Sequence, residues 1–232
     1  TATTGNMSDS GNVTVAGTSS FTTSANNATI TLDNNNALTG AVSLNTTGSS
    51  GNVQLDNGTT ALNIGASSVG GFLIVTSGNA SGITDSGTVT VGNYLAARTD
   101  ANNGSINLDQ LAVDGVITLN THGSGNATIV NDAVINLYTS THTIGGNLAV
   151  TATTGNITDS GAGLTVAGTS SFTTSANNAT ITLDNTNALT GAVTITTNDD
   201  SGTDADVTID NGTTALILAA STIDGDLTVT SG

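Results

Sequence analysis

The chain contains one long stretch twice, and this duplication is its strongest constraint on folding. Residues 14–42 return as residues 165–193, and the copies differ only where Asn35 is replaced by Thr186. Weaker similarity divides the chain into units 1–75, 76–150 and 151–229, with a fourth unit starting at Thr230. Tandem units of this kind are typical of architectures in which repeats stack or follow one another along a rod. Because residues 1–5 also recur as 151–155 in mid-chain, we expect a single continuous body cut from a longer sequence.

Apolar residues inside a unit form short runs with a period of two. Examples are Ile30 and Leu32, and Val42 and Leu44, each pair separated by one polar residue. This alternation is typical of strands that bury one face. Asn-Gly, Ser-Gly and Asp-Ser-Gly clusters between the runs supply turns. Helical spacing is almost absent, so the sequence predicts an all-β protein.

Two architectures fit seven short strands in about 75 residues. The first is a string of immunoglobulin-like sandwiches, which normally rely on buried aromatic residues. The chain has three Phe, two Tyr and no Trp, which disfavours this arrangement. The second is a β-solenoid, favoured because strong strands recur below the unit level and because Asn and Thr can form ladders when coils stack. At about 25 residues per rung we expect about nine rungs, roughly three per unit, in a rod of about 45 Å.

The charge balance excludes some partners. The chain has 17 acidic residues, all Asp, and a single cation, Arg98, so its formal charge is −16. Binding to nucleic acid or to anionic lipid needs Lys and Arg to displace counterions, so neither is expected. No apolar run approaches the roughly 18 residues of a membrane span, so no membrane insertion is expected.

The carboxylates that could serve catalysis are periodic. They occur at equivalent points of the units, in the sets Asp33, Asp109 and Asp184; Asp56 and Asp210; and Asp9, Asp85 and Asp159. A glycoside hydrolase needs two carboxylates at a defined separation in one cleft, and a lyase needs a base with a cation such as Arg98. Periodic positions indicate structural turns, so we expect no enzyme and no catalytic or cofactor-binding residue.

Metal binding has one candidate. Asp199, Asp200, Asp204 and Asp206 lie in a Gly-containing loop whose oxygen ligands suit Ca²⁺. The alternative is a solvated acidic insertion, which the absence of this loop from the other units favours. His122 and His142 lie alone in Gly- and Thr-rich loops and are expected to be exposed polar residues.

Three short runs of the sequence resemble the repeats of a known protein family. Residues 146–152 (GNLAVTA), 155–161 (GNITDSG) and 225–230 (GDLTVT) resemble repeats of filamentous-haemagglutinin-like adhesins, large exoproteins of Gram-negative bacteria exported by two-partner or autotransporter routes. The resemblance implies a right-handed parallel β-helix, an extracellular or cell-surface location, and a role in adhesion or matrix building. The secretion domain expected at the start of such proteins is not in this sequence.

Taken together, these features predict a structural or adhesive segment of a giant extracellular repeat protein. Its expected partners are neighbouring repeats or copies of itself, surface glycans, and host or matrix proteins. The alternatives are a Ca²⁺-dependent assembly module and a carbohydrate-binding or carbohydrate-active β-helix.

Overall fold

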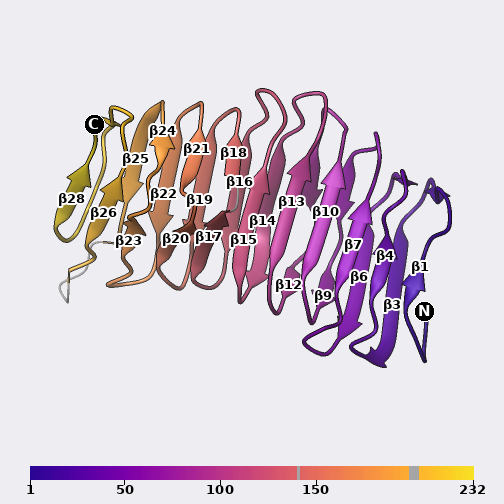
Figure 1. Cartoon of the computed structure of the whole chain (residues 1–232). Helices are drawn as coiled ribbons and strands as arrows, with labels where there is room; N and C mark the ends of the chain where they lie inside the picture. The colour runs from indigo at the N-terminus through magenta and orange to yellow at the C-terminus, as the bar shows by residue number, and fades with distance from the viewer. Residues whose placement is uncertain (140–141, 199–203) are drawn as a thin grey trace.

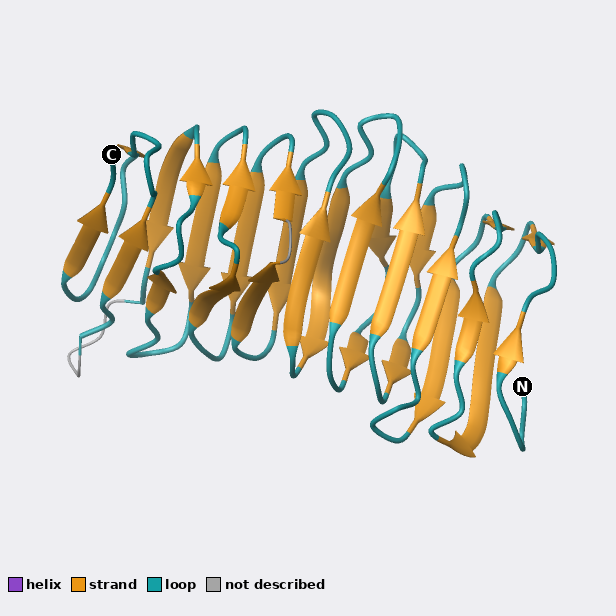
Figure 2. Cartoon of the chain, in the orientation of Figure 1, coloured by secondary structure: helices purple, strands orange, loops and turns teal. Residues whose placement is uncertain are grey.

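The computed structural model describes residues 1–139, 142–198 and 204–232, and these contain strands, turns and loops but no helix (Figure 2). All the strand pairs are parallel, and they form two large facing sheets and one small one. No described helix is long and apolar enough to cross a membrane.

The first sheet has one strand from each turn along its main path. These are β1 (Met7–Ser8), β4 (Ile30–Leu32), β7 (Val53–Asp56), β10 (Leu73–Ser77), β13 (Leu95–Thr99), β15 (Val116–Asn120), β17 (Ile135–Thr139), β20 (Ile157–Gly161), β23 (Ile181–Leu183), β26 (Val207–Asp210) and β28 (Leu227–Thr230). Three short strands extend it, namely β18 (His142–Ile144), β21 (Leu164–Val166) and β24 (Ala188–Leu189).

The second sheet lies behind the first. Its strands are β3 (Ser19–Asn26), β6 (Val42–Thr47), β8 (Leu62–Ile64), β9 (Ser67–Val69), β11 (Ile83–Asp85), β12 (Val89–Val91), β14 (Ile106–Val113), β16 (Ala127–Asn131), β19 (Leu148–Ala152), β22 (Ser170–Thr174), β25 (Ala192–Thr196) and β27 (Ile217–Leu218). The small sheet pairs β2 (Thr14–Val15) with β5 (Ala37–Leu38).

The chain winds as a right-handed parallel β-solenoid of about ten turns (Figure 1). Consecutive turns place equivalent residues 20 to 26 apart, as from Val53 to Leu73 and from Ile181 to Val207. The predicted fold is therefore confirmed. The turns outnumber the expected nine because most are shorter than 25 residues. At about 4.8 Å per turn, ten turns measure about 48 Å.

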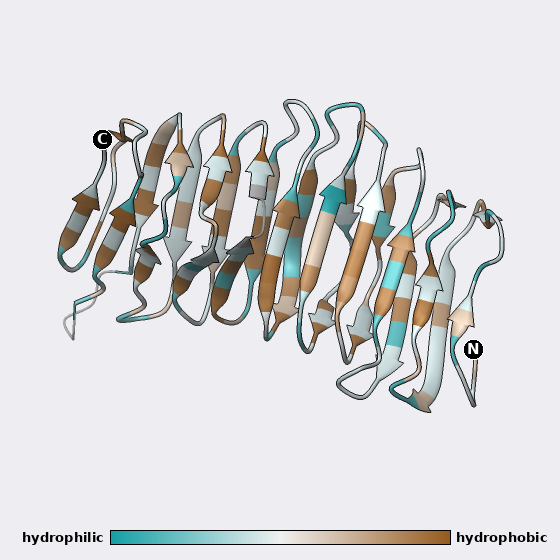
Figure 3. Ribbon diagram, in the orientation of Figure 1, coloured by the Kyte–Doolittle hydropathy of each residue, from teal (hydrophilic) through white to brown (hydrophobic). Residues whose placement is uncertain are grey.

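The core is a set of apolar columns that run between the sheets. One column contains Ile30, Val53, Leu73, Leu95 and Ile117 from consecutive turns, each 0% exposed. Bands of apolar and polar residues alternate along the strands, as the two-residue period predicts (Figure 3). Each turn adds only a few buried side chains, worth about 1.5–3 kcal/mol each, so it depends on its neighbours for stability.

One unit spans three and a half turns, so equivalent segments alternate between the two sheets. Ile30 of unit one lies in the first sheet, Ile106 of unit two in the second, and Ile181 of unit three in the first again. Seven steps along the first sheet separate β4 from β23, which are two units apart. The expectation of about three rungs per unit misses this half turn.

The same half turn is visible in the paired short strands. In the first half of the chain β8 with β9, and β11 with β12, lie in the second sheet. Their equivalents one unit later, β17 with β18 and β20 with β21, lie in the first sheet. Each unit is therefore related to the next by a half-turn screw along the rod.

Candidate functional site: polar corners and grooves along the stack

A carboxylate joins two consecutive turns in each unit. Asp9 accepts hydrogen bonds from the side-chain amides of Asn34 (2.8 Å) and Asn36 (2.9 Å) in the next turn. Asp159 of unit three accepts the equivalent bond from Asn187 (2.9 Å) and another from the backbone N–H of Asp184 (3.0 Å). These carboxylates therefore connect turns of the backbone.

Unit two keeps the carboxylate but changes its partners. Asp85 accepts the backbone N–H groups of Asp109 (3.2 Å) and Gln110 (2.9 Å), and within the described part of the chain no Asn side chain is among its hydrogen-bond donors. Burial raises the pKa of Asp85, the two N–H donors oppose this, and the nearby charge of Asp109 adds to the rise. Burial also pushes the pKa of Asp9 upward, but the Asn36 and Asn34 donors outweigh it, and the net pKa is lowered. The side-chain amides of Asn34 and Asn36 therefore decide whether the pKa of the carboxylate is lowered or raised.

A buried Asn forms the corner at the end of a strand in every unit. Asn57 is 0% exposed; its Oδ1 accepts the N–H of Leu38 (2.9 Å), and its Nδ2 donates to the carbonyls of Leu38, Thr60 and Ala61. Asn131 and Asn211 repeat this pattern with Val113 and Leu189 of the preceding turn. The corner therefore satisfies backbone groups where the chain leaves the sheet.

A groove runs along the corner that follows the first sheet. It has a volume of about 320 Å³ and crosses consecutive turns, and the lining residues with polar side chains are Asn12, Asn35, Asn36, Asp56, Thr59, Thr60 and Asp100. Burial raises the pKa of Asp56, and the charges of Asp100 and Asp33 add to the rise. The groove offers amides, hydroxyls and carboxylates, which suit cations or sugar hydroxyls and repel anions.

Unit two has a related groove on the opposite side of the rod. This cavity of about 240 Å³ is lined by Thr88, Asp109, Gln110, Leu111, Val130, Asp132 and Thr153, and it lies beside the register irregularity within the second-sheet strand β14. Thr88 stands where Asn12 stands in unit one, and Asp109 stands where Asp33 does. The half-turn screw therefore presents these related grooves on alternating faces.

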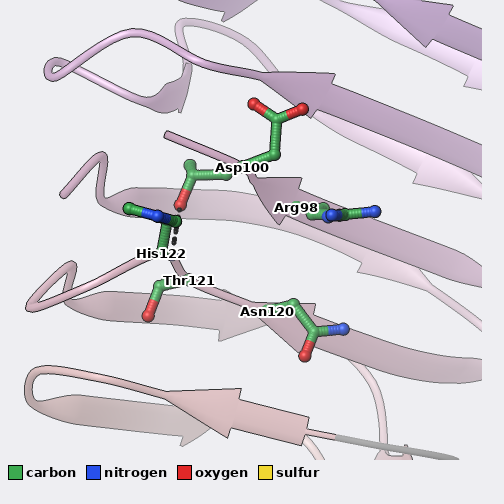
Figure 4. A pocket seen from close by; sticks show the side chains of 6 residues that line it. Arg98, Asp100, Asn120, Thr121 and His122 are labelled. Carbon is green, nitrogen blue, oxygen red and sulfur yellow. Dashed lines mark hydrogen bonds between the residues drawn. The ribbon is translucent and has the colours of Figure 1, made fainter. Parts of the chain in front are cut away.

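The single cation lies in a third groove, of about 400 Å³, lined by Arg98, Thr99, Asp100, Asn120, Thr121 and His122. Arg98 and Asn120 are partners on neighbouring strands β13 and β15. Figure 4 shows the Arg98 and His122 side chains pointing in opposite directions, with Asp100 directed away from both.

One known repeat family matches most of the chain. The family described as "Repeats of unknown function (DUF5649)" matches residues 1–45, 50–123 and 124–196, most of the chain. The chain belongs to this repeat family. No curated protein and no solved structure matches it.

The predicted candidate carboxylates take repeated positions in this DUF5649 chain. Asp33 and Asp184 are exposed directly after the equivalent strands β4 and β23, whereas Asp109 is exposed within the longer strand β14. Asp56 and Asp210 each accept the N–H of the Gly two residues later at 2.7 Å. The prediction that these Asp residues form turns is confirmed for Asp56 and Asp210 by these hydrogen bonds and is wrong for Asp109 and Asp159, which lie inside β14 and β20.

The predicted calcium loop is only partly described. Asp199 and Asp200 lie outside the described residues, whereas Asp204 and Asp206 are exposed. Asp206 Oδ1 accepts the backbone N–H of Asp226 at 2.8 Å, so it too joins two turns. In the described part of the chain no three His, Cys, Asp or Glu residues gather as a metal site. Calcium binding stays a prediction, tested by comparing the melting temperature in Ca²⁺ and in chelator.

His122 is exposed, and its backbone N–H donates to Thr99 Oγ1 (3.2 Å). The side chain of His142 lies outside the described part of the structure. Sequence reasoning missed the Asn57, Asn131 and Asn211 corners. A signal was available, since the motif Asp-Asn-Gly-Thr-Thr-Ala-Leu occurs in units one and three and places Asn after the strand.

Proposed function

We propose that this chain is a shaft segment of a large extracellular bacterial repeat protein, resembling filamentous-haemagglutinin-like adhesins. The observation that supports it best is the continuous stack of turns with the two termini at opposite ends (Figure 1). A chain folded in this way separates whatever is attached to its two ends by a fixed distance of about 48 Å.

The contacts between turns suit a stiff rod. Strand hydrogen bonds run along the rod axis, and side chains such as Asn126, Asn147 and Asn156 each accept a backbone N–H from the next turn. Bending would have to break several of these bonds together. The rod therefore gains stiffness from many small, repeated contacts.

The surface is consistent with exposure to water outside the cell. The formal charge of −16 keeps rods apart laterally and favours solubility. It also opposes binding to nucleic acid and to anionic membranes. We propose no enzymatic activity and no obligatory cofactor for this segment.

Tandem linkage tests the shaft. One, two and three copies of residues 1–229, joined in phase, should form rods in negative-stain electron micrographs, each copy adding about 50 Å at 10.5 turns of about 4.8 Å. Compact particles, or lengths that do not grow with copy number, would overturn the proposal.

The polar grooves support glycan binding as a second candidate. Their lining of amides, hydroxyls and carboxylates recurs on both faces, so a rod could hold several weak sites and gain avidity. A glycan array probed with the three-copy rod tests it. If the double variant Asp56→Ala and Asp100→Ala loses the signal, the sugar binds in the groove that these two residues line. An array without any signal would contradict glycan binding and leave the shaft proposal unaffected.

A further inference from the structure

The outer face of the first sheet departs from the repeat at one place. Phe72 stands where Asn147 and Asp226 stand in the other two units, and Tyr94 stands where Thr18 and Thr169 stand. In both cases an aromatic residue replaces a polar residue of the repeat. Since the chain has only three Phe and two Tyr, two such replacements on neighbouring strands are a singular feature and not part of the repeat.

These two aromatic side chains point away from the core. Phe72 precedes the buried Leu73 of β10, and Tyr94 precedes the buried Leu95 of β13, so alternation along each strand directs both rings outward. Leu73 and Leu95 are strand partners, and the N–H of Leu73 donates to the carbonyl of Tyr94 at 2.8 Å. Phe72 and Tyr94 therefore lie one turn apart on the same face, and both are partly exposed.

Smaller apolar side chains surround the two rings. Ile74, Ala96 and Val116 are partly exposed and lie on the same outer face of β10, β13 and β15. Together with Phe72 and Tyr94 they form what we name the aromatic strip. It extends about 10 Å along the rod, because neighbouring strands lie about 4.8 Å apart, and about 16 Å along the strands, because five residues span that length.

The single Arg of the chain lies at one end of the aromatic strip. Arg98 is exposed on the outer face of β13, two residues beyond Ala96. It too departs from the repeat, since Thr22 and Thr173 stand at its position. Arg98 is the strand partner of Asn120 in the next turn, and both line the groove of about 400 Å³ (Figure 4). The strip and this groove are therefore continuous.

The charges around the aromatic strip favour an uncharged ligand. None of the five side chains of the strip is charged, and the formal charge of −16 opposes the approach of a polyanion. Arg98 opposes a cationic ligand at the end of the strip. Asp56 lies on the other side of Thr76 from Arg98 and opposes an anionic one. An uncharged molecule avoids both penalties.

The size of the aromatic strip favours a thin ligand over a folded protein. Its area is about 160 Å², whereas each partner in a standard protein interface buries about 800 Å². A second copy of this rod is disfavoured further, because both copies carry the same negative charge. The strip is therefore large enough for a few sugar rings and too small for a stable protein interface.

The chemistry of the aromatic strip suits a sugar. A sugar ring presents C–H groups on its face, which pack on aromatic rings, and hydroxyls at its edge, which need donors and acceptors. Gln54 lies beside Ile74 on β7, and Asn120 lies beside Arg98 on β15, so amide groups flank the strip on both sides. The Arg98 guanidinium adds a fork of N–H donors.

We propose that the aromatic strip binds a neutral glycan, with sugar rings packed on Phe72 and Tyr94 and sugar hydroxyls bonded to Arg98. The strip is a different surface from the polar groove that contains Asp56. The inference rests on glycan binding, the second candidate function, for which it gives the class of sugar and an aromatic surface. It does not depend on the shaft.

Variants that restore the repeat test the strip. Phe72→Asn, Tyr94→Thr and Arg98→Thr each introduce the residue that an equivalent position already carries, so each should fold, as circular dichroism can show. In calorimetric titrations with cellohexaose, laminarihexaose and mannohexaose, we expect the wild-type chain to bind at least one hexamer saturably. Phe72→Asn and Tyr94→Thr should each weaken that binding by at least about tenfold.

Thr182→Ala is the matched control, because Thr182 lies on the outer face of β23 in the same sheet but away from the strip. It should bind like the wild-type chain. Binding that both aromatic variants retain would overturn the strip and leave glycan binding to the polar grooves. An absence of binding to all three hexamers would also overturn the strip, while the length of linked rods would still test the shaft.

The charge of the ligand is tested with two further probes. Hexagalacturonate is anionic and a chitosan hexamer is cationic, and each should bind the wild-type chain at least about tenfold more weakly than the best neutral hexamer. Equal or tighter binding of either charged hexamer would overturn the assignment to a neutral glycan.

Tyrosine fluorescence tests where the glycan lies. Because the chain has no Trp and only two Tyr, Tyr138→Phe leaves Tyr94 as its single Tyr. The neutral hexamer that binds in calorimetry should change the Tyr94 emission with the same midpoint. An unchanged emission at saturation would place the sugar away from Tyr94 and overturn the strip.

Discussion

At the scale of single residues, a few side chains supply the backbone hydrogen bonds that the sheets cannot. Asn57 alone makes four hydrogen bonds to backbone groups from a fully buried position. Replacing it with Ala removes all four. We expect Asn57→Ala to lower the free energy of unfolding by at least about 2 kcal/mol, measured by urea denaturation.

The chain provides its own control for this substitution. Asn35 is exposed nearby, and the duplicate carries Thr at the same position, Thr186. Asn35→Thr should change the free energy of unfolding by less than about 0.5 kcal/mol. Equal effects of the two substitutions would show that the corner does not depend on Asn57.

Two equivalent carboxylates should respond oppositely to acid. The pKa of Asp9 is lowered below the ordinary 3.8, so its stabilising contribution is full above that value and is lost as pH falls through the folded pKa. The pKa of Asp85 is raised, so its charge costs stability at neutral pH, and the cost is relieved as pH falls through the folded pKa.

Asn substitutions at the two sites measure this contrast. The stability lead of wild type over Asp9→Asn should shrink once pH falls below about 4, whereas its lead over Asp85→Asn should grow as pH falls from 7 toward about 4. Urea titrations at several pH values give both curves. Parallel curves would mean that the Asn34 and Asn36 donors do not set the Asp9 pKa.

At the scale of the strand and corner, identical local sequences meet different neighbours. Gly168 and Gly17 occupy the same position in the duplicated stretch. A Cβ added at Gly168 would lie 2.6 Å from the carbonyl oxygen of Gly146 in the preceding turn, whereas one at Gly17 would meet nothing within 4 Å. The same local sequence therefore meets a backbone neighbour at Gly168 and open space at Gly17.

Gly168→Ala should therefore lower the free energy of unfolding by about 1–3 kcal/mol, and Gly17→Ala by less than about 0.5 kcal/mol. Thermal and urea unfolding of the two variants give the comparison. Equal losses would place the cost in the local backbone and not in the stacking of turns.

The strands and corners show which parts of the fold can be predicted from the sequence. Alternating pairs such as Ile30 and Leu32 predict buried strands correctly, and turn residues predict the corners, because both depend on local chemistry. Which sheet a strand joins depends on the number of turns per unit. That number is set by corner lengths, which vary from turn to turn, so the half turn could not be predicted.

The grooves could not be predicted from the sequence. Asp56 and Asp100 line one groove although a whole turn containing β10 lies between their strands. Their proximity follows from the register of three strands, which periodicity alone does not fix. Asp56 and Asp210 were predictable as turn residues, whereas the groove beside Asp56 was not.

At the scale of the whole molecule, the half-turn screw makes the unit removable. Deleting residues 76–150 joins Val75 to Thr151, which is the unit-three equivalent of Thr76. Every new contact between turns then resembles one that already exists between units one and two. Because stability in stacked repeats is nearly a sum over neighbours, the shortened chain should still fold cooperatively.

The deletion should shorten the rod by three and a half turns, about 17 Å, which small-angle X-ray scattering can measure. Deleting residues 76–111 instead joins the first-sheet strand β10 to the end of the second-sheet strand β14, so that control should lose cooperative unfolding. If both deletions fold equally well, contacts between turns do not depend on the phase of the repeat. If neither deletion variant folds, the three units are not equivalent along the rod. The length of the rod could then not change by the gain or loss of one unit.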